Sequence, residues 1–371
     1  MSRTGRNRRR TGAGLTYPAS LMLSAIGLAQ TPHDQRAETR THEQIPIEVF
    51  QAPHPKRLAS PNCDIQGRLG DRSGACEALL ERTEGWVELG FMVDPRGKPF
   101  EITVIRSTGN KTFDEAATKA IEQSTFEPAL LDKQPIESGY ELKYLFLNRN
   151  MGGMSGASGA FVSEYKALMS AINSADRAAA DVALGKLTIG NLYEDAYFGL
   201  ATYNYSKKWG DESQQLEGLR RAIAEEDVAH YLPKDLFQSA LLARMRLELN
   251  AHDYAEVMTT WKRLGKLGVD KDTQSRLLPV INQLQKLRSD DSVYEVPGLM
   301  PEGRWFLHLF KRHFQAVVSE GFISQVKLRC DKRYVYFAFD PKLQYEVARE
   351  YGNCSVELEG APGTKFKLVQ F

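Results

Sequence analysis

The chain has 371 residues, of which 42% are hydrophobic and 26% charged, and this length and composition fit two or three globular domains. Its 48 basic and 47 acidic residues nearly balance, which argues against a dedicated nucleic-acid-binding protein, since such proteins usually carry a basic excess. No clean apolar run of about 18 residues follows position 30, so we expect no membrane span in the body of the chain.

Residues 1–29 have the organisation of an export signal. The segment holds five arginines and no acidic residue near its start, and an apolar stretch then ends in small residues that suit cleavage after Ala29. We therefore predict a secretory signal peptide. An uncleaved membrane anchor and a misassigned start codon remain alternatives, because about 18 residues interrupted by Pro18 are marginal for a membrane span.

Two segments have the composition of flexible chain. Residues 30–74 are polar, contain five prolines and show no sustained period, so we predict a flexible leader. Residues 150–161 contain four glycines among small residues, which is typical of a linker. Between them, residues 75–149 form a block with clear hydrophobic periodicity.

The block reads as strand, strand, helix, strand, with a short helix at 76–82 in front. Apolar residues alternate at 87–93 and again from Phe100, and a Pro-Gly turn at 94–97 joins these two strands. Thr112 with Glu115 forms a capping box for a helix at 113–123. The apolar stripe of this helix comprises Phe113, Ala116, Ala117, Ala120 and Ile121. A last alternating strand covers 140–147.

These residues resemble the C-terminal domain of TonB, the energy transducer of Gram-negative bacteria, over about 75 of the 371 residues. The resemblance is carried by Gly85-Trp86-Val87-Glu88-Leu89, Val93-Asp94-Pro95-Arg96-Gly97, Phe113-Asp114-x-x-Ala117 and Phe126-Glu127-Pro128-Ala129. It implies a small sheet packed on a helix, located in the periplasm. It also implies binding of an extended peptide from an outer-membrane receptor beside the last strand, by β-augmentation. The implied edge comprises Tyr140, Glu141, Leu142, Lys143, Tyr144, Leu145, Phe146 and Leu147.

Residues 162–290 are predicted to be helical, because apolar side chains recur there with a period near 3.6. The segments 209–211 and 252–254 occupy similar positions between helices about 43 residues apart, a period typical of a tetratricopeptide-like array. The cluster of four tyrosines within this region could line a peptide groove, or could simply pack between helices. It consists of Tyr193, Tyr197, Tyr203 and Tyr205.

Residues 300–371 contain six or seven short alternating segments punctuated by Gly and Pro, which predict a small β-sandwich or barrel. The four cysteines lack any Cys-x-x-Cys spacing, so a zinc site is not expected. Export and the local spacings favour two disulfides, Cys330–Cys354 and Cys63–Cys76. Four buried or free thiols are the alternative.

We find no constellation of residues that predicts catalysis, a cofactor or a metal site. His308 and His313 lie five residues apart in or near strands, a poor metal-binding spacing. The acidic run Glu225-Glu226-Asp227 is most simply a solvated helix end.

The sequence therefore predicts an α+β multidomain protein with a TonB-like sheet-plus-helix domain, a helical middle and a small β-rich end. We expect a periplasmic, non-enzymatic adaptor that binds an envelope protein by strand addition, with a link to transport through outer-membrane receptors. Nucleic acid is not an expected partner, and membrane contact would occur only through residues 1–29 if uncleaved. Two alternatives remain: an energy transducer anchored in the inner membrane, and an envelope enzyme with a site between the helical and C-terminal domains.

Overall fold

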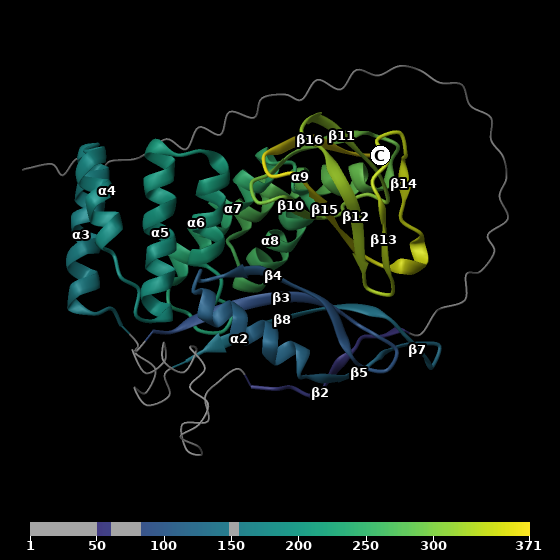
Figure 1. Ribbon diagram of the computed structural model, residues 1–371. Coiled ribbons are helices and arrows are strands. Elements are labelled where there is room, and N and C mark those ends of the chain that lie inside the picture. The colour runs from purple at the N-terminus through teal and green to yellow at the C-terminus, as the bar shows by residue number, and fades with distance from the viewer. Residues whose placement is uncertain (1–49, 61–82, 148–155) are drawn as a thin grey trace, which may run out of the picture. The chain divides into compact units, whose positions relative to one another are not determined.

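The computed structural model describes three ranges of the chain, namely residues 50–60, 83–147 and 156–371 (Figure 1). The predicted signal or anchor, the predicted helix at 76–82 and Cys63 and Cys76 lie outside the described residues. So do most of the predicted leader and residues 150–155 of the predicted linker. In the part of the chain that is described, no helix is both long and apolar enough to cross a membrane.

Three antiparallel strands form the first sheet, in the order β4-β3-β8. They are β3 (Gly85–Val93), β4 (Pro99–Ser107) and β8 (Ser138–Phe146). The turn between β3 and β4 requires Gly97, whose φ is 78°. A Cβ atom at Gly97 would lie 2.0 Å from the carbonyl oxygen of Phe126, so no larger residue fits this turn.

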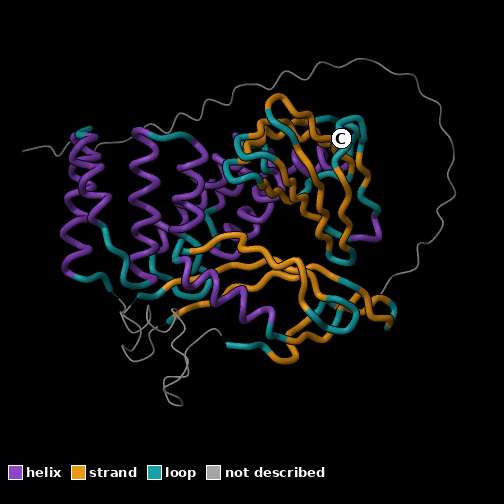
Figure 2. Tube along the Cα trace, viewed as in Figure 1, coloured by secondary structure: helices purple, strands orange, loops and turns teal. Residues whose placement is uncertain are grey.

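Helix α2 (Lys111–Glu122) covers one face of this sheet (Figure 2). Four residues of the predicted stripe, Phe113, Ala117, Ala120 and Ile121, are buried as expected. The predicted cap at Thr112 is wrong: the N-cap is Asn110, whose side chain accepts a hydrogen bond of 3.0 Å from the backbone N–H of Thr112. Asparagine is among the best N-cap residues, so the helix begins two residues earlier than the capping box indicated.

Part of the predicted flexible leader forms strands instead. Strand β1 (Phe50–Gln51) pairs with β6 (Ala129–Leu131), and β2 (His54–Arg57) pairs with β5 (Thr125–Glu127). Strand β7 (Gln134–Ile136) pairs with β6. The flexible-leader interpretation is therefore wrong for residues 50–57. The prolines had indicated flexible chain, but proline is tolerated in edge strands, where one side of the backbone has no hydrogen-bonded partner strand.

The middle region is helical, as its periodicity predicted. Its described helices are α3 (Gly159–Ser174), α4 (Arg177–Lys186), α5 (Leu192–Trp209), α6 (Glu212–Ala222), α7 (Lys234–Asn250), α8 (Tyr254–Leu267) and α9 (Lys271–Ser289). Helices α5 and α6 approach each other closely at Gly199, where a Cβ atom would lie 2.4 Å from the backbone nitrogen of Ala222. The tyrosine cluster packs between elements: the Tyr193 and Tyr197 ring centroids lie 4.9 Å apart, and Tyr197 also contacts Tyr165 of α3.

The C-terminal region contains two antiparallel sheets of four strands each, in the orders β10-β15-β12-β13 and β14-β11-β16-β9. The strands are β9 (Tyr294–Met300), β10 (Arg304–His308), β11 (His313–Glu320), β12 (Ile323–Cys330), β13 (Tyr334–Ala338), β14 (Tyr345–Glu346), β15 (Cys354–Gly360) and β16 (Thr364–Gln370). Cys330 and Cys354 lie opposite each other on β12 and β15 and form a disulfide, which confirms that predicted pairing.

The helical and C-terminal regions share one hydrophobic core rather than two. The ring of Tyr254 at the start of α8 lies 4.8 Å from that of Tyr294 on β9 and 5.7 Å from that of Phe310. The expected division near residues 290–300 therefore does not separate two cores, because β9 starts at Tyr294 and packs directly on the helices.

Candidate functional site

Strand β8 is an edge of the first sheet, because it pairs with β3 and with no other strand among the described residues. The register between them is continuous from Gly85 opposite Phe146 to Val93 opposite Ser138. On the other side of β3, the N–H of Thr108 donates to the carbonyl of Trp86. The backbone of Trp86 therefore points toward β4, and that of its neighbour Val87 points toward β8.

Backbone N–H and C=O groups alternate in direction along a strand, so the direction of these groups is known at every position of β8. The even-numbered residues from Ser138 to Phe146 hydrogen-bond to β3. The N–H and C=O groups of Glu141, Lys143 and Leu145 point away from the sheet, and no hydrogen-bond partner is seen for them within the described ranges. Within the described ranges, the outer edge of β8 thus presents a row of backbone donors and acceptors without partners.

One set of side chains on β8 anchors the strand to the core under α2. Phe146 is fully buried and stacks on Phe113, with ring centroids 4.2 Å apart. Tyr144 is also buried, and its hydroxyl donates to the carbonyl of Ala59 over 2.9 Å. These contacts fix which face of β8 is turned toward the helix.

The opposite face of β8 is held by the helical region through Lys143. Its Nζ atom lies 3.1 Å from Oε1 of Glu225 and donates to the carbonyl of Ala224 over 2.9 Å. The same ammonium group lies 5.1 Å from the ring centroid of Trp86, a cation–π distance. Burial raises the pKa of Glu225, whereas the Lys143 charge lowers it. The sequence interpretation of Glu225 and Glu226 as solvated is therefore wrong, since their exposed fractions are 9% and 1%.

A second ionic contact links β8 to both other regions through His308 of β10. Its Nε2 atom lies 3.5 Å from the Glu141 carboxylate, and its Nδ1 atom lies 3.2 Å from the Glu256 carboxylate of α8. Burial opposes the imidazolium charge, but the hydrogen bonds to these two carboxylates raise the pKa of His308 to about 10. The Glu256 carboxyl is also buried, but its bonds to His308 and Arg244 lower its pKa to about 2.

Two further contacts hold the rest of the sheet. The indole N–H of Trp86 donates to Asp195 of α5 over 3.1 Å, and Arg221 of α6 donates to the same carboxylate over 2.7 Å. Arg329 of β12 donates to the Thr103 hydroxyl over 3.1 Å and to the carbonyl of Glu101. Both faces of the sheet are therefore covered. Among the described residues β4 and β8 each pair only with β3, so they are the two edges of the sheet.

The sequence identified the edge strand but not the residues that hold it. Strand β8 ends at Phe146, and Leu147 follows it with an exposed fraction of 42%. Glu225 and His308 were missed because each is more than eighty residues from its partner on β8. No local pattern in the sequence marks such residues as buried.

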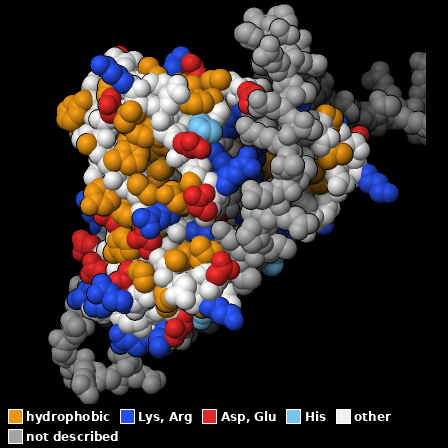
Figure 3. Space-filling model, turned by 90° about the vertical axis from the view of Figure 1, so that its right-hand side faces the viewer, with side chains coloured by type: hydrophobic (Ala, Val, Ile, Leu, Met, Phe, Trp, Pro, Cys, Tyr) orange, Lys and Arg blue, Asp and Glu red, His pale blue; other side chains and the backbone are white. Residues whose placement is uncertain are grey.

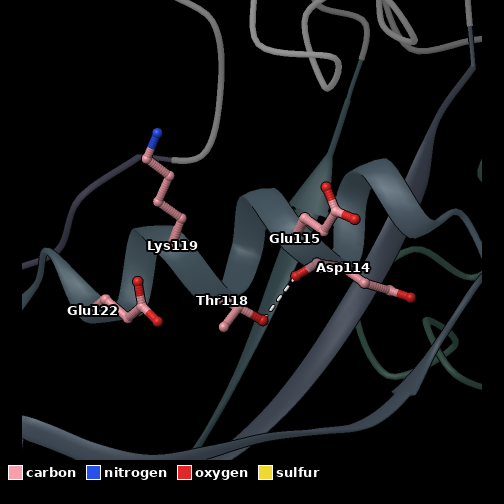
Figure 4. Close-up of a pocket in the computed structure, with 5 residues that line it drawn as sticks. All are labelled: Asp114, Glu115, Thr118, Lys119 and Glu122. Atoms are coloured by element: carbon pink, nitrogen blue, oxygen red, sulfur yellow. Dashed lines mark hydrogen bonds between the residues drawn. The ribbon is translucent and has the colours of Figure 1, made fainter.

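The described residues contain no group of three or more His, Cys, Asp or Glu side chains placed to hold a metal ion. A shallow depression lies on the outer surface of α2 (Figure 4), lined by Asp114, Glu115, Thr118, Lys119 and Glu122. All five side chains come from one helix, and Thr118 bonds to the backbone carbonyl of Asp114. Because a single helix face cannot surround a ligand, we assign no chemistry to this depression.

Comparison with known proteins agrees with the geometry of the first sheet. Residues 76–147 match the family model described as Gram-negative bacterial TonB protein C-terminal. A 64-residue stretch is 38% identical to Protein TonB of Haemophilus ducreyi, which covers 17% of this chain and 23% of that protein. The chain thus matches about a quarter of the length of this relative, and the family match ends at residue 147, before the helical and C-terminal regions. Residues 76–147 are thus similar to the C-terminal domain of TonB, and this part of the chain is called the TonB C-terminal domain below.

Proposed function

We propose that the TonB C-terminal domain binds an extended segment of an envelope protein along the outer edge of β8. The observation that carries this proposal is the row of outward backbone groups at Glu141, Lys143 and Leu145, which lacks a partner in the described chain. A partner strand would gain affinity from main-chain hydrogen bonds and specificity from alternate side chains. An open edge is a hazard that proteins usually cover or blunt, so its retention here favours a docking role.

The surroundings of β8 support this assignment. Both faces of the sheet are already covered, by α2 and by the helical and C-terminal regions, so a partner strand can extend the sheet but cannot stack on it. Glu141 and Lys143 are held by ion pairs with His308 and Glu225, so the strand is already ordered before binding. A preordered edge loses less conformational entropy when a partner binds.

The whole chain would act as a non-enzymatic adaptor in the periplasm, with the partner supplied by an outer-membrane receptor or another transport protein of the envelope. In this proposal the helical region, which we predict to be tetratricopeptide-like, and the C-terminal region, which we predict to be a β-sandwich, hold the TonB C-terminal domain in a fixed position. The anchored energy transducer is the alternative. The amino-terminal residue of the mature protein separates the two, because Gln30 at the start indicates cleavage and a retained segment 1–29 indicates an anchor.

Photocrosslinking tests the proposed edge in intact cells. A photoreactive residue at Leu147, directly after β8, should crosslink to an envelope protein. The matched control is the same residue at Val182 of α4, which is 58% exposed and lies in another region. Equal crosslinking to the same partner from both positions, or none from Leu147, would count against β8 as the binding edge.

A further inference from the structure

The C-terminal region has a second unpaired edge, on strand β13. This strand is last in its sheet and pairs only with β12 within the described residues. The N–H of Phe339 donates to the carbonyl of Ser324 over 3.0 Å, and the N–H of Cys330 donates to the carbonyl of Arg333 over 2.9 Å. Because these groups alternate along a strand, the N–H and C=O groups of Val335 and Phe337 point toward β12. Those of residues 334, 336, 338 and 340 point outward.

At both ends of this row of outward N–H groups, the N–H already donates to a side chain. The N–H of Tyr334 donates to the Glu137 carboxylate over 3.3 Å, and the N–H of Asp340 donates to the hydroxyl of Tyr345 over 3.1 Å. The N–H groups of Tyr336 and Ala338 between them have no partner in the described chain. We call Tyr336–Ala338 the unpaired window. It is symmetric about Phe337, because on each side one outward N–H without a partner is followed by one that is hydrogen-bonded.

Strand β13 is apolar, and exposed apolar side chains occur on it and just outside the strands β12 and β13 in the sequence. Residues 334–339 read Tyr-Val-Tyr-Phe-Ala-Phe without a charge or a proline, and the β12–β13 register has no bulge. The exposed fractions of Tyr336, Phe322 and Leu343 are 63%, 60% and 50%. Figure 3 views the molecule from the side where β13 and β14 lie in Figure 1, and hydrophobic side chains gather on that face. Strand β13 thus lacks the charges, prolines and bulges that normally protect an edge.

We propose that β13 is a dimerisation edge, which pairs in antiparallel orientation with β13 of a second copy about a two-fold axis at Phe337. The N–H of Tyr336 donates to the Ala338 carbonyl of the second copy, and the N–H of Ala338 donates to its Tyr336 carbonyl. The two-fold axis repeats both bonds, so every free donor in the window is used. The two four-stranded sheets join into one continuous sheet across the dimer.

Two observations favour a second copy over an unrelated strand. A window that is symmetric about one residue is self-complementary, which a two-fold interface requires. The charges at its ends are also complementary: Arg333 precedes the strand and Asp340 follows it, so antiparallel pairing brings the basic end of one strand to the acidic end of the other. The Arg333 side chain is 56% exposed, although its Nε atom also lies 3.5 Å from the Glu137 carboxylate of its own chain.

Sedimentation velocity of the purified full chain tests this proposal. The wild type should shift from monomer to dimer as its concentration rises through the micromolar range. Ala338→Pro removes one outward donor without touching the bonds to β12, and should raise the dimer dissociation constant roughly tenfold or more. Ala338→Ser keeps the donor and should dimerise like the wild type. Thermal unfolding of both variants should match the wild type, which shows that the proline variant is folded.

Three results would overturn the proposal. The first is a wild type that stays monomeric at every concentration, which would leave this edge to a different partner. The second is a folded Ala338→Pro variant that dimerises normally. The third is a dimer that Leu145→Pro on β8 abolishes while Ala338→Pro does not, because the copies would then pair through the other edge.

Discussion

Replacing Arg329 with Met tests how strongly the buried ion pair between Arg329 of β12 and Glu357 of β15 stabilises the protein. The guanidinium of Arg329 is 9% exposed and donates to the Glu357 carboxylate over 2.9 Å, and that carboxylate is 4% exposed. The next cation, Arg304, lies 4.0 Å from Glu357 and is 59% exposed. The substitution therefore leaves a buried carboxylate almost without compensation, which costs about 3–5 kcal/mol of unfolding free energy.

A double variant isolates this effect. Arg329→Met combined with Glu357→Leu removes both charges, and replacing a whole buried pair by apolar residues is often close to neutral. Both variants lose the bonds to Thr103 and Glu101 equally, so the difference between them measures the stranded charge. Urea denaturation followed by far-UV circular dichroism gives the free energies. The reasoning is refuted if the single variant loses less than about 1 kcal/mol, or if the double variant is no more stable than the single one.

Two further predictions concern pH and helix capping. The pKa of His308 is raised from 6.5 to about 10 and that of Glu256 is lowered from 4.5 to about 2, so their stabilising contribution should be complete between pH 4.5 and 6.5 and should fall on either side. Melting temperatures measured within this pH range and on both sides of it should show the plateau in the wild type and lose it in His308→Gln; an unchanged profile in that variant would contradict the assignment. In α2, Asn110→Ala should cost about 1 kcal/mol and Thr112→Ala much less, because Asn110 is the cap. Thermal unfolding distinguishes them, and the reverse order would restore Thr112 as the cap.

The sequence was informative where structure is decided by near neighbours. The alternation at 87–93 and the stripe from Phe113 to Ile121 each report which face of one element is buried, and such periodicity is local. The cap was missed because Asn110 and Thr112 are both good capping residues two positions apart, and only the backbone conformation chooses between them.

Prediction failed where burial comes from a distant part of the chain. Glu225 follows a helix in an acidic run, yet Lys143 lies beside it in the fold and makes its burial possible. Residues 50–57 have a leader-like composition, yet β5 and β6 supply partners for them. The edge position of β8 was inferred from a family resemblance and not from its residues, because strand order depends on pairing between segments that are far apart.

The most direct test of the account compares Leu145→Pro with Leu145→Ala, each carrying the photoreactive residue at Leu147. Both variants lose the leucine side chain, but only the proline loses the outward N–H, while the ladder to β3 stays complete in each. If a partner strand adds to β8, crosslinking to the envelope partner should persist in Leu145→Ala and fall roughly tenfold or more in Leu145→Pro, at equal melting temperatures. Equal crosslinking from two equally folded variants would contradict recognition through this edge.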